Sequence, residues 1–305
     1  MRSPLTQPPE EVRLLAEERA ARRRARDFEE ADALREKIRA LGFEVTDRPD
    51  GGFDLRREEK PPPGPSRIRA EEVRSVLGDV PAADVTVQWL SEGWPDDVLR
   101  GIRSFRRFED GRSVQHVVVE TRAEPPGSWP QGVEVVPLAH DPGFGAVRNA
   151  GLRRSLGRMV IVADGSVEAQ TDPYAPLERT LIDPSVGIAG PYGLVTDDLR
   201  EFRQHHGPDV DAVEGYLMAF RRALLEDGLA FDEGYRFYRA ADIDLCFQVK
   251  ERGLRVVRVA VPVRRHEHRR WAVTSQADRD RLSKRNFYRF LDRFRGRRDL
   301  LVAGR

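Results

Sequence analysis

Cysteine is almost absent from the sequence, because the 305 residues contain only Cys246. A single thiol cannot form an internal disulfide, and so sparing a use of cysteine suits a reducing compartment. Lysine is also rare, since only four of the 52 basic residues are lysine. The arginine excess suits phosphate binding, because a guanidinium group grips oxyanions with two parallel hydrogen bonds. The codon usage of a GC-rich genome would produce the same excess, and we favour that explanation.

Long apolar runs are missing as well. No segment approaches the roughly 20 apolar residues that a helix needs to span a bilayer. The N-terminal residues, rich in proline and glutamate, lack the apolar core of a signal peptide. Acidic and basic residues nearly cancel, at 51 and 52, so no overall charge draws the chain to nucleic acid or to a membrane. We therefore expect a cytoplasmic protein without a transmembrane segment, long enough for two domains of unequal size.

The N-terminal part predicts a small module of two helices and a β-hairpin. Residues 10–26 have helical periodicity, and Asp27 with Glu30 three residues later forms a capping-box pattern that begins a second helix. That helix is expected to end at Gly42. Two segments of alternating polarity then flank the turn residues 49–52, which is typical of a β-hairpin.

A domain boundary is expected at the proline-rich segment 61–65, PPPGP, which favours a stiff, extended chain. A short amphipathic segment over residues 70–77 follows it. We therefore divide the chain into an N-terminal module of residues 1–60, a linker with a short helix over residues 61–83, and a larger domain of residues 84–305.

The larger domain alternates between strand and helix patterns. Apolar, β-branched segments predict strands at 85–90, 117–119, 133–138, 159–162 and 256–263, and helical patterns predict helices at 95–108, 145–156 and 243–252. Such alternation indicates a Rossmann-like α/β fold, in which a mostly parallel sheet is covered by helices on both faces.

Polar residues stand where three of these strands end: Ser91 with Glu92, then Glu120, then Asp164 with Ser166. In an open α/β sheet, ligands bind outside the carboxyl ends of the strands. A nucleoside diphosphate needs polar groups for its base and ribose, and a cation for its leaving pyrophosphate. We expect Asp164 to contact a divalent cation, Mg²⁺ or Mn²⁺, because a carboxylate is a hard oxygen ligand and the neighbouring glycine lets the backbone approach a phosphate.

Longer runs of this domain resemble the family 2 glycosyltransferases, which are of the GT-A type. Residues 143–152 read GFGAVRNAGL and residues 160–166 read VIVADGS, similar to the run in which an Arg-Asn-x-Gly helix leads into a strand ending in the metal-binding DxD motif. Residues 215–245 carry GYLMAFRR, FDE, FY and ADIDL in the order of that family's acceptor-side block. The resemblance covers about residues 84–301. It implies a GT-A fold and the inverting transfer of a sugar, expected to be a hexose, from a UDP- or GDP-sugar.

The resemblance adds two residues to the expected donor site, and three positions depart from the family pattern. Arg148 and Asn149 match the Arg-Asn pair, which places them near the donor diphosphate. Ser166 replaces the second carboxylate of the DxD motif, and a hydroxyl is a poorer ligand for Mg²⁺ or Mn²⁺. Glu120 stands for the usual Asp, and Ala241 for the usual Glu before the base. These departures weaken the metal site or require ligands from elsewhere.

His266 and His268 are candidates for the missing ligands. They follow the strand predicted at 256–263, where similar enzymes have a metal-binding or pyrophosphate-facing histidine. Residues i and i+2 of an extended segment point the same way. An imidazole of this pair could therefore share a cation with the carboxylate of Asp164. The alternative is a polar surface loop without a ligand. If the segment does face the donor, its neighbouring arginines could offset diphosphate charge even without a tightly bound metal.

Asp242 is the expected catalytic base, and Asp244 is the second candidate. An inverting transferase needs a carboxylate that removes the proton of the acceptor hydroxyl as it attacks the anomeric carbon. At the start of a helix over residues 243–252, two acids at this spacing point apart, so only one can face the sugar. The alternative is that both carboxylates cap this helix.

The N-terminal module resembles a different family. Residues 26–35, RDFEEADALR, and residues 38–47, IRALGFEVTD, are similar to the C-terminal end of cysteinyl-tRNA synthetases, over about residues 10–57. Contact of residues 22–24, RRR, with RNA phosphates is one implication. Interleaved acids favour a solvated helix face instead, and a role in docking or homo-oligomer formation is another alternative.

Three functions are therefore open at the level of sequence. The first is an inverting transferase acting on an unknown acceptor. The second is a non-catalytic protein or scaffold that binds a nucleotide-sugar through an eroded DxD motif. The third is an RNA-associated accessory factor that acts through the N-terminal module. Asp164, Asp242 and His268 together favour the enzyme, whereas Ser166 and Ala241 favour the binding protein.

Overall fold

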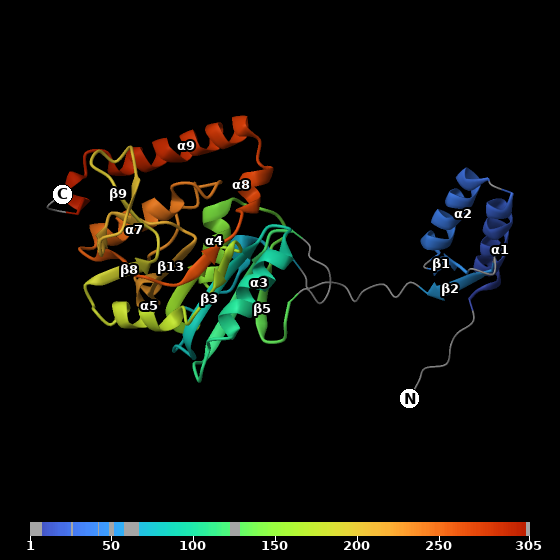
Figure 1. The fold of residues 1–305 in the computed structure, drawn as a ribbon, viewed down its shortest axis with the longest axis horizontal. Helices are drawn as coiled ribbons and strands as arrows, with labels where there is room; N and C mark the ends of the chain where they lie inside the picture. The colour runs from blue at the N-terminus through green and yellow to red at the C-terminus, as the bar shows by residue number, and fades with distance from the viewer. Residues whose placement is uncertain are drawn as a thin grey trace. The chain divides into compact units, whose positions relative to one another are not determined.

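The computed structural model describes residues 8–25, 27–41, 43–48, 52–57, 67–122 and 129–302. The chain divides into two compact units, Met1–Gly64 and Pro65–Arg305, which are described separately below (Figure 1). Three features expected from the sequence fall outside the described residues: the helix end at Gly42, the hairpin turn at 49–51 and the proline-rich segment 61–65. No helix in the described part of the chain combines the length and apolar character that a bilayer span requires.

The first unit contains the expected helical pair and β-hairpin. Its elements are α1 (Glu10–Arg24), α2 (Phe28–Ala40), β1 (Phe43–Asp47) and β2 (Phe53–Arg57). β1 and β2 pair in antiparallel register, which confirms the hairpin. The side chain of Asp27 accepts a hydrogen bond from the Glu30 N–H at 3.4 Å, in agreement with a capped start of α2. A small apolar core, which includes Val12 and Ile38, joins helices and hairpin.

The second unit is built on an eight-stranded sheet with the strand order β11-β14-β8-β13-β6-β3-β4-β5. Its strands are β3 (Ala83–Ser91), β4 (Val114–Glu120), β5 (Val133–Pro137), β6 (Gly157–Ala163), β8 (Val186–Gly190), β11 (Asp209–Val210), β13 (Leu217–Arg221) and β14 (Arg255–Arg258). β13 runs antiparallel to both of its neighbours, and β11 runs antiparallel to β14. The other neighbouring pairs are parallel, so the predicted mostly parallel α/β sheet is confirmed.

Helices cover both faces of this sheet, as the sequence predicted. One face packs on α3 (Pro95–Arg106) and α5 (Tyr174–Leu181), and the other packs on α4 (Phe144–Leu152), α6 (Ala223–Glu226) and α7 (Ala241–Glu251). Side chains of a strand alternate between the two faces. In β6, Ile161 therefore packs in the cluster of α3 and α5, while Val160 and Val162 pack in the cluster of α7.

Two small sheets and a C-terminal pair of helices complete the second unit. β7 (Val167–Ala169) pairs with β15 (Val263–Arg265), and β9 (Gly193–Val195) pairs with β10 (Arg203–His205) and β12 (Ala212–Val213). The chain then forms α8 (Arg269–Val273), α9 (Gln276–Phe294) and the short helix η2 (Arg298–Leu300) (Figure 1). Phe290 and Phe294 of α9 pack on Phe247 of α7.

The structure corrects two expectations about segments. The strand predicted at 256–263 is two strands, because β14 ends at Arg258 and the chain re-forms as β15 after Pro262, which has no N–H for a ladder. Residues 67–83, expected in the linker, pack within the second unit instead. Ile68 makes a parallel bridge with Leu138, and the short helix η1 (Ala70–Glu72) packs on α4.

Candidate functional site

Asp164 lies directly after β6, at the carboxyl end of the sheet. Its Oδ1 accepts hydrogen bonds from the N–H and the hydroxyl of Ser166, and its Oδ2 lies 3.4 Å from Nε2 of His268. Desolvation by itself would raise the pKa of this carboxyl group. The hydrogen bond and charge of His268, with the two bonds from Ser166, outweigh it and hold the pKa far below its ordinary value. Asp164 is therefore ionised at neutral pH.

His268 caps the N-terminus of α8, with its Nδ1 accepting from the N–H of Trp271 at 3.3 Å. An accepting Nδ1 leaves the proton of a neutral ring on Nε2, which faces Asp164. Desolvation would lower the pKa of His268, but the hydrogen bond and charge of Asp164 raise it. The ring also stacks on Tyr238 with centroids 4.3 Å apart. Its position is thus fixed by a carboxylate, a backbone group and an aromatic ring.

His266 does not share that environment, which corrects the expectation that both imidazoles point the same way. Its Nε2 lies 2.8 Å from the carboxylate of Glu168 in β7. The expectation assumed one continuous extended segment, whereas β15 ends at Arg265 and His268 already begins α8. The two rings therefore contact different carboxylates, and only His268 contacts Asp164.

The donor-side residues Ser91 and Glu92 lie at the end of β3, where they meet the start of α8. Ser91 is fully buried, and Glu92 forms an ion pair with Arg270. Arg269 pairs with Asp97 in the first turn of α3 at 2.9 Å. Desolvation raises the pKa of Glu92, and Arg270 opposes this rise. Between these elements lies a hollow of about 30 Å³ that Asp164 also lines.

Asp242, on the first turn of α7, lines a cavity of about 410 Å³ together with Asp164 and His268. Its Oδ2 accepts from the N–H of Gly215 at 2.7 Å, and its Oδ1 accepts from its neighbour Ile243 at 2.9 Å. Desolvation raises the pKa of Asp242, and the two N–H groups oppose the rise. The structure therefore brings together the expected metal contact and the expected base.

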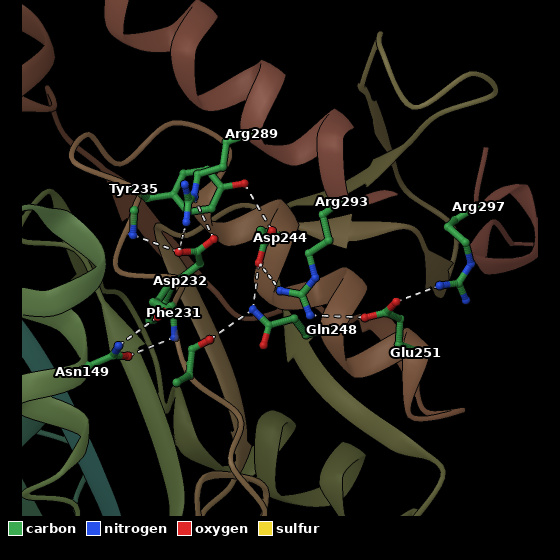
Figure 2. Close-up of polar contacts among 12 residues, drawn as sticks. Asn149, Phe231, Asp232, Tyr235, Asp244, Gln248, Glu251, Arg289, Arg293 and Arg297 are labelled. Atoms are coloured by element: carbon green, nitrogen blue, oxygen red, sulfur yellow. Dashed lines mark hydrogen bonds and ion pairs between the residues drawn. The ribbon is translucent and has the colours of Figure 1, made fainter. Parts of the chain in front are cut away.

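Asp244 is not among the residues that line this cavity, and Figure 2 shows its carboxylate among Tyr235, Gln248 and Arg293. It is 1% exposed, and its oxygens accept from Gln248 at 2.7 Å, from the Tyr235 hydroxyl at 3.2 Å and from Arg293 of α9 at 3.4 Å. Desolvation raises its pKa. Of the two acids in this motif, only Asp242 faces the cavity, as expected from their spacing.

Asn149 and Arg148 of α4 have different surroundings. The Asn149 side chain exchanges two hydrogen bonds with the backbone of Phe231, at 2.8 and 2.9 Å, which ties α4 to the chain before α7 (Figure 2). Arg148 lines the cavity and bonds to the Gln88 side chain at 2.6 Å and to the Ala163 carbonyl at 3.2 Å. Burial lowers the pKa of this guanidinium group to about 10.

Glu120, the third strand-end acid, is buried at the end of β4. Its carboxylate accepts from the indole of Trp129 and lies 3.5 Å from the guanidinium group of Arg67. Within the described residues, Glu120 is not among the residues that line either the larger cavity or the hollow beside Asp164.

Sequence reasoning missed the other half of the cavity wall. Tyr216 and Tyr238, with Arg239, lie beside Asp164 and Asp242, and α9 contributes further residues. The signal for Tyr238 and Arg239 was their place just before the ADIDL motif. No local pattern indicated α9, because its contribution depends on how the chain folds back over α7.

No protein-family model matches this chain, and no curated protein matches it in sequence. Solved structures do match. The crystal structure of GalNAc-T7 with UDP, GalNAc and Mn²⁺ has 15% identity and a TM-score of 0.54, covering 69% of this chain and 48% of its own. Mannosyltransferase PcManGT from Pyrobaculum calidifontis, in complex with GDP-Man and Mn²⁺, has 20% identity and a TM-score of 0.47, covering 63% and 62%. S. aureus TarS 1–349 has 14% identity and a TM-score of 0.46, covering 69% and 72%.

The likeness to GalNAc-T7 defines the fold of the second unit, which is of the GT-A type. This chain spans about half the length of that structure's chain. At 15% identity, the likeness concerns the fold alone. The fold class expected from the sequence is therefore confirmed. Membership of family 2 and the resemblance to cysteinyl-tRNA synthetases stay predictions.

Proposed function

We propose that the unit Pro65–Arg305 is a glycosyltransferase. It moves a sugar, expected to be a hexose, from a UDP- or GDP-sugar to an acceptor hydroxyl, with inversion at the anomeric carbon. One observation carries this proposal: Asp164 and Asp242 come from distant parts of the sequence and line the same cavity. The motifs that resemble family 2 support the same reaction. GalNAc-T7, whose fold this unit shares, was crystallised with UDP, GalNAc and Mn²⁺.

A buried guanidinium group supports an anionic ligand beside Asp164. Arg148 is 1% exposed, and its hydrogen bonds go to neutral groups of Gln88 and Ala163. Its Nε has no hydrogen-bond partner among the described residues. A buried charge without an ionic partner is costly. The charges of Asp164 and Glu92 act on Arg148 without a direct ion pair among the described residues, and the donor diphosphate would add an anion in direct contact that accepts charge-assisted hydrogen bonds.

Asp164 and His268 fit a divalent cation that is shared with the donor. They offer a carboxylate oxygen and, once Nε2 of His268 releases the proton that it turns toward Asp164, a ring nitrogen 3.4 Å away. The part of the chain that the structure describes holds no cluster of three or more His, Cys, Asp or Glu side chains that could bind a metal alone. Mg²⁺ is commonly held by one or two protein groups, with waters and substrate phosphates completing its shell. When bound, such a cation would offset the charge of the leaving diphosphate.

Asp242 would act as the general base. As the acceptor oxygen bonds to the anomeric carbon, its proton passes to the Asp242 carboxylate. The bond between that carbon and the diphosphate oxygen breaks, and its electron pair stays on the diphosphate. A carboxylate with a raised pKa accepts a proton more readily than an exposed one, which suits Asp242.

Ligand-dependent thermal unfolding tests the donor site. UDP or GDP should raise the Tm of the full chain, and Mn²⁺ should increase the rise. Asp164→Ala and His268→Ala should each abolish the Mn²⁺-dependent part. His266→Ala is the matched control, because that ring contacts Glu168 rather than Asp164. The donor assignment is wrong if no nucleoside diphosphate shifts the Tm at millimolar concentration. Inversion is tested by the anomeric proton coupling of the product in NMR spectra.

A second candidate is a protein that binds a nucleotide-sugar without turning it over. Ser166, in place of a carboxylate, and the small hollow beside Glu92, only about 30 Å³ in volume, favour it. This candidate predicts that UDP or GDP binds with the same affinity in wild type and Asp242→Asn, and that neither form releases a nucleoside diphosphate from its sugar.

A further inference from the structure

The cavity that holds Asp242 has an apolar wall that the transfer chemistry does not use. This wall is formed by Leu194, Phe202, Phe231, Ile243, Phe287 and Phe290. Phe290 also contacts Phe202, with ring centroids 5.8 Å apart, so the wall is continuous with the core between α7 and α9. Sugar hydroxyls gain little binding free energy from contact with such a surface. An apolar group is stabilised there in proportion to the area that it buries.

Two arginines interrupt this apolar wall. Arg200 and Arg239 line the same cavity, and neither forms an ion pair with a carboxylate among the described residues. The guanidinium carbon of Arg239 lies 5.8 Å from the ring centroid of Trp271. By contrast, Glu214 in the cavity pairs with Arg265 at 3.2 Å. The charge of Arg239 acts on Asp242 and Glu214 at a distance, and the N–H donors of both arginines can bind an added anion in direct contact.

The backbone beside each of these arginines is held in an unusual conformation. Leu199 precedes Arg200, Ala240 follows Arg239, and each has a left-handed φ of 66°. Such a backbone persists only where its surroundings fix it, and it is frequent at ligand sites. The buried Leu199 side chain supplies one anchor. The Asp198 carboxylate supplies another by accepting from the Arg200 N–H at 2.8 Å. Arg200 thus projects from an anchored backbone, and Arg239 precedes Ala240, whose carbonyl accepts from the Asp244 N–H at 3.0 Å.

We propose that the acceptor is a small amphiphilic anion. Its apolar body lies against Phe202, Phe287 and Phe290, and its phosphate, carboxylate or sulfate group is held by Arg200 and Arg239. The acceptor hydroxyl then lies beside Asp242 on the same cavity. The cavity of about 410 Å³ must also take the part of the donor beside Asp164 and Arg148, so the acceptor is a small molecule. This inference rests on the proposed function, because it names the substrate class of that site.

Calorimetric titration of the full chain with three probes tests the proposal. Phenyl phosphate has both an apolar body and an anion, inorganic phosphate has only the anion, and benzyl alcohol has only the body. Phenyl phosphate should bind at least about tenfold more tightly than either fragment, because both parts of the cavity contribute. Arg200→Gln, Arg239→Gln and Phe287→Ala should each weaken it about tenfold, as expected for loss of one charge-assisted contact or one buried ring.

Arg203→Gln is the matched control. Arg203 lies three residues from Arg200, pairs with Asp197 at 2.6 Å and does not line the cavity. Its variant should bind phenyl phosphate as wild type does. Equal weakening by Arg203→Gln would overturn the proposal, because it would reveal only a general loss of positive charge.

Titrations with UDP separate this proposal from the proposed function. If UDP with Mn²⁺ binds and phenyl phosphate does not, the acceptor class is wrong and the transferase stands. If phenyl phosphate binds and no nucleoside diphosphate does, the transferase fails and the anion site stands. If UDP displaces phenyl phosphate and Arg200→Gln weakens UDP equally, the cavity holds the donor and the proposal is overturned. If the protein sediments with phosphatidic acid vesicles but does not bind phenyl phosphate, the proposal of a small soluble acceptor is likewise overturned.

Discussion

Asp242 accepts a hydrogen bond from the backbone N–H of Gly215 at 2.7 Å, which joins the first turn of α7 to the chain just before β13. Its other oxygen accepts from the N–H of Ile243. Both carboxylate oxygens therefore have a fixed direction, and each retains a second lone pair that can face the cavity. A side chain held in this way is positioned to take a proton without first changing its rotamer.

The first prediction separates Asp242 from Asp244. Asp242→Asn should lower kcat about 10²- to 10⁴-fold, the usual contribution of a general base. It should also cost about 1–2 kcal/mol of stability, because the amide group can accept only one of the two N–H bonds. Asp244→Asn is the matched variant on the same helix, and it should change the Tm while kcat stays within a few-fold. If the Asp244 variant loses turnover instead, the role of base passes to that residue.

The second prediction concerns the pH dependence of turnover. Asp242 must be ionised to accept a proton, so kcat/KM should rise with pH through its pKa. Desolvation raises that pKa above its ordinary value of 3.8, while the charge of Arg239 opposes the rise. Arg239→Gln removes the guanidinium charge, so the acid limb of the pH profile of kcat/KM should move to higher pH. Added salt should reduce the difference between the profiles of wild type and variant. An acid limb that moves to lower pH in the variant would contradict the assignment.

The ends of the predicted strands located much of the site from the sequence alone. The β-branched segments that form β3, β4 and β6 were recognisable, and the rule that ligands bind at their carboxyl ends placed Asp164 correctly at the sheet edge. The spacing of Asp242 and Asp244 also predicted that only one of them would face the cavity. These features depend on local periodicity, which a sequence displays directly.

Features set by long-range packing were not predictable in this way. The separation of His266 from His268 depends on where β15 ends and α8 begins, and Arg270 reaches Glu92 only because α8 folds against the end of β3. Phe287 lines the cavity because α9 returns over α7. Each of these features depends on a contact between segments that are far apart in the sequence.

The third prediction tests whether Asn149 supports the fold or binds the donor. Its side chain accepts from the Phe231 N–H and donates to the Phe231 carbonyl, and both partners are buried. Asn149→Ala leaves both backbone groups unpaired, which should cost about 2 kcal/mol or more in the free energy of unfolding. Denaturant unfolding and UDP titration in the presence of Mn²⁺ measure the two effects. A weaker affinity for UDP with unchanged stability would restore the donor-binding role.

The fourth prediction is that residues 1–64 are dispensable for donor binding. The unit Pro65–Arg305 has its own hydrophobic clusters on both faces of its sheet. Truncation before Pro65 should therefore leave a cooperatively folding protein with an unchanged Kd for UDP. Calorimetry and circular dichroism of the truncated chain provide the measurement. A molten or insoluble product would show that the first unit is required for the fold of the second.

The fifth prediction examines the hydroxyl that replaces a DxD carboxylate. In Ser166→Asp, the loss of the hydroxyl bond to Asp164 and the added like charge should lower the Tm without a cation. Mn²⁺ should then raise the Tm more than in wild type, because two hard carboxylate ligands would share it. Ser166→Ala loses the same hydrogen bond without adding charge, so its lower Tm should not recover with Mn²⁺. If both variants respond equally to Mn²⁺, the cation does not bind between residues 164 and 166, and Arg148 would have to neutralise the diphosphate without it.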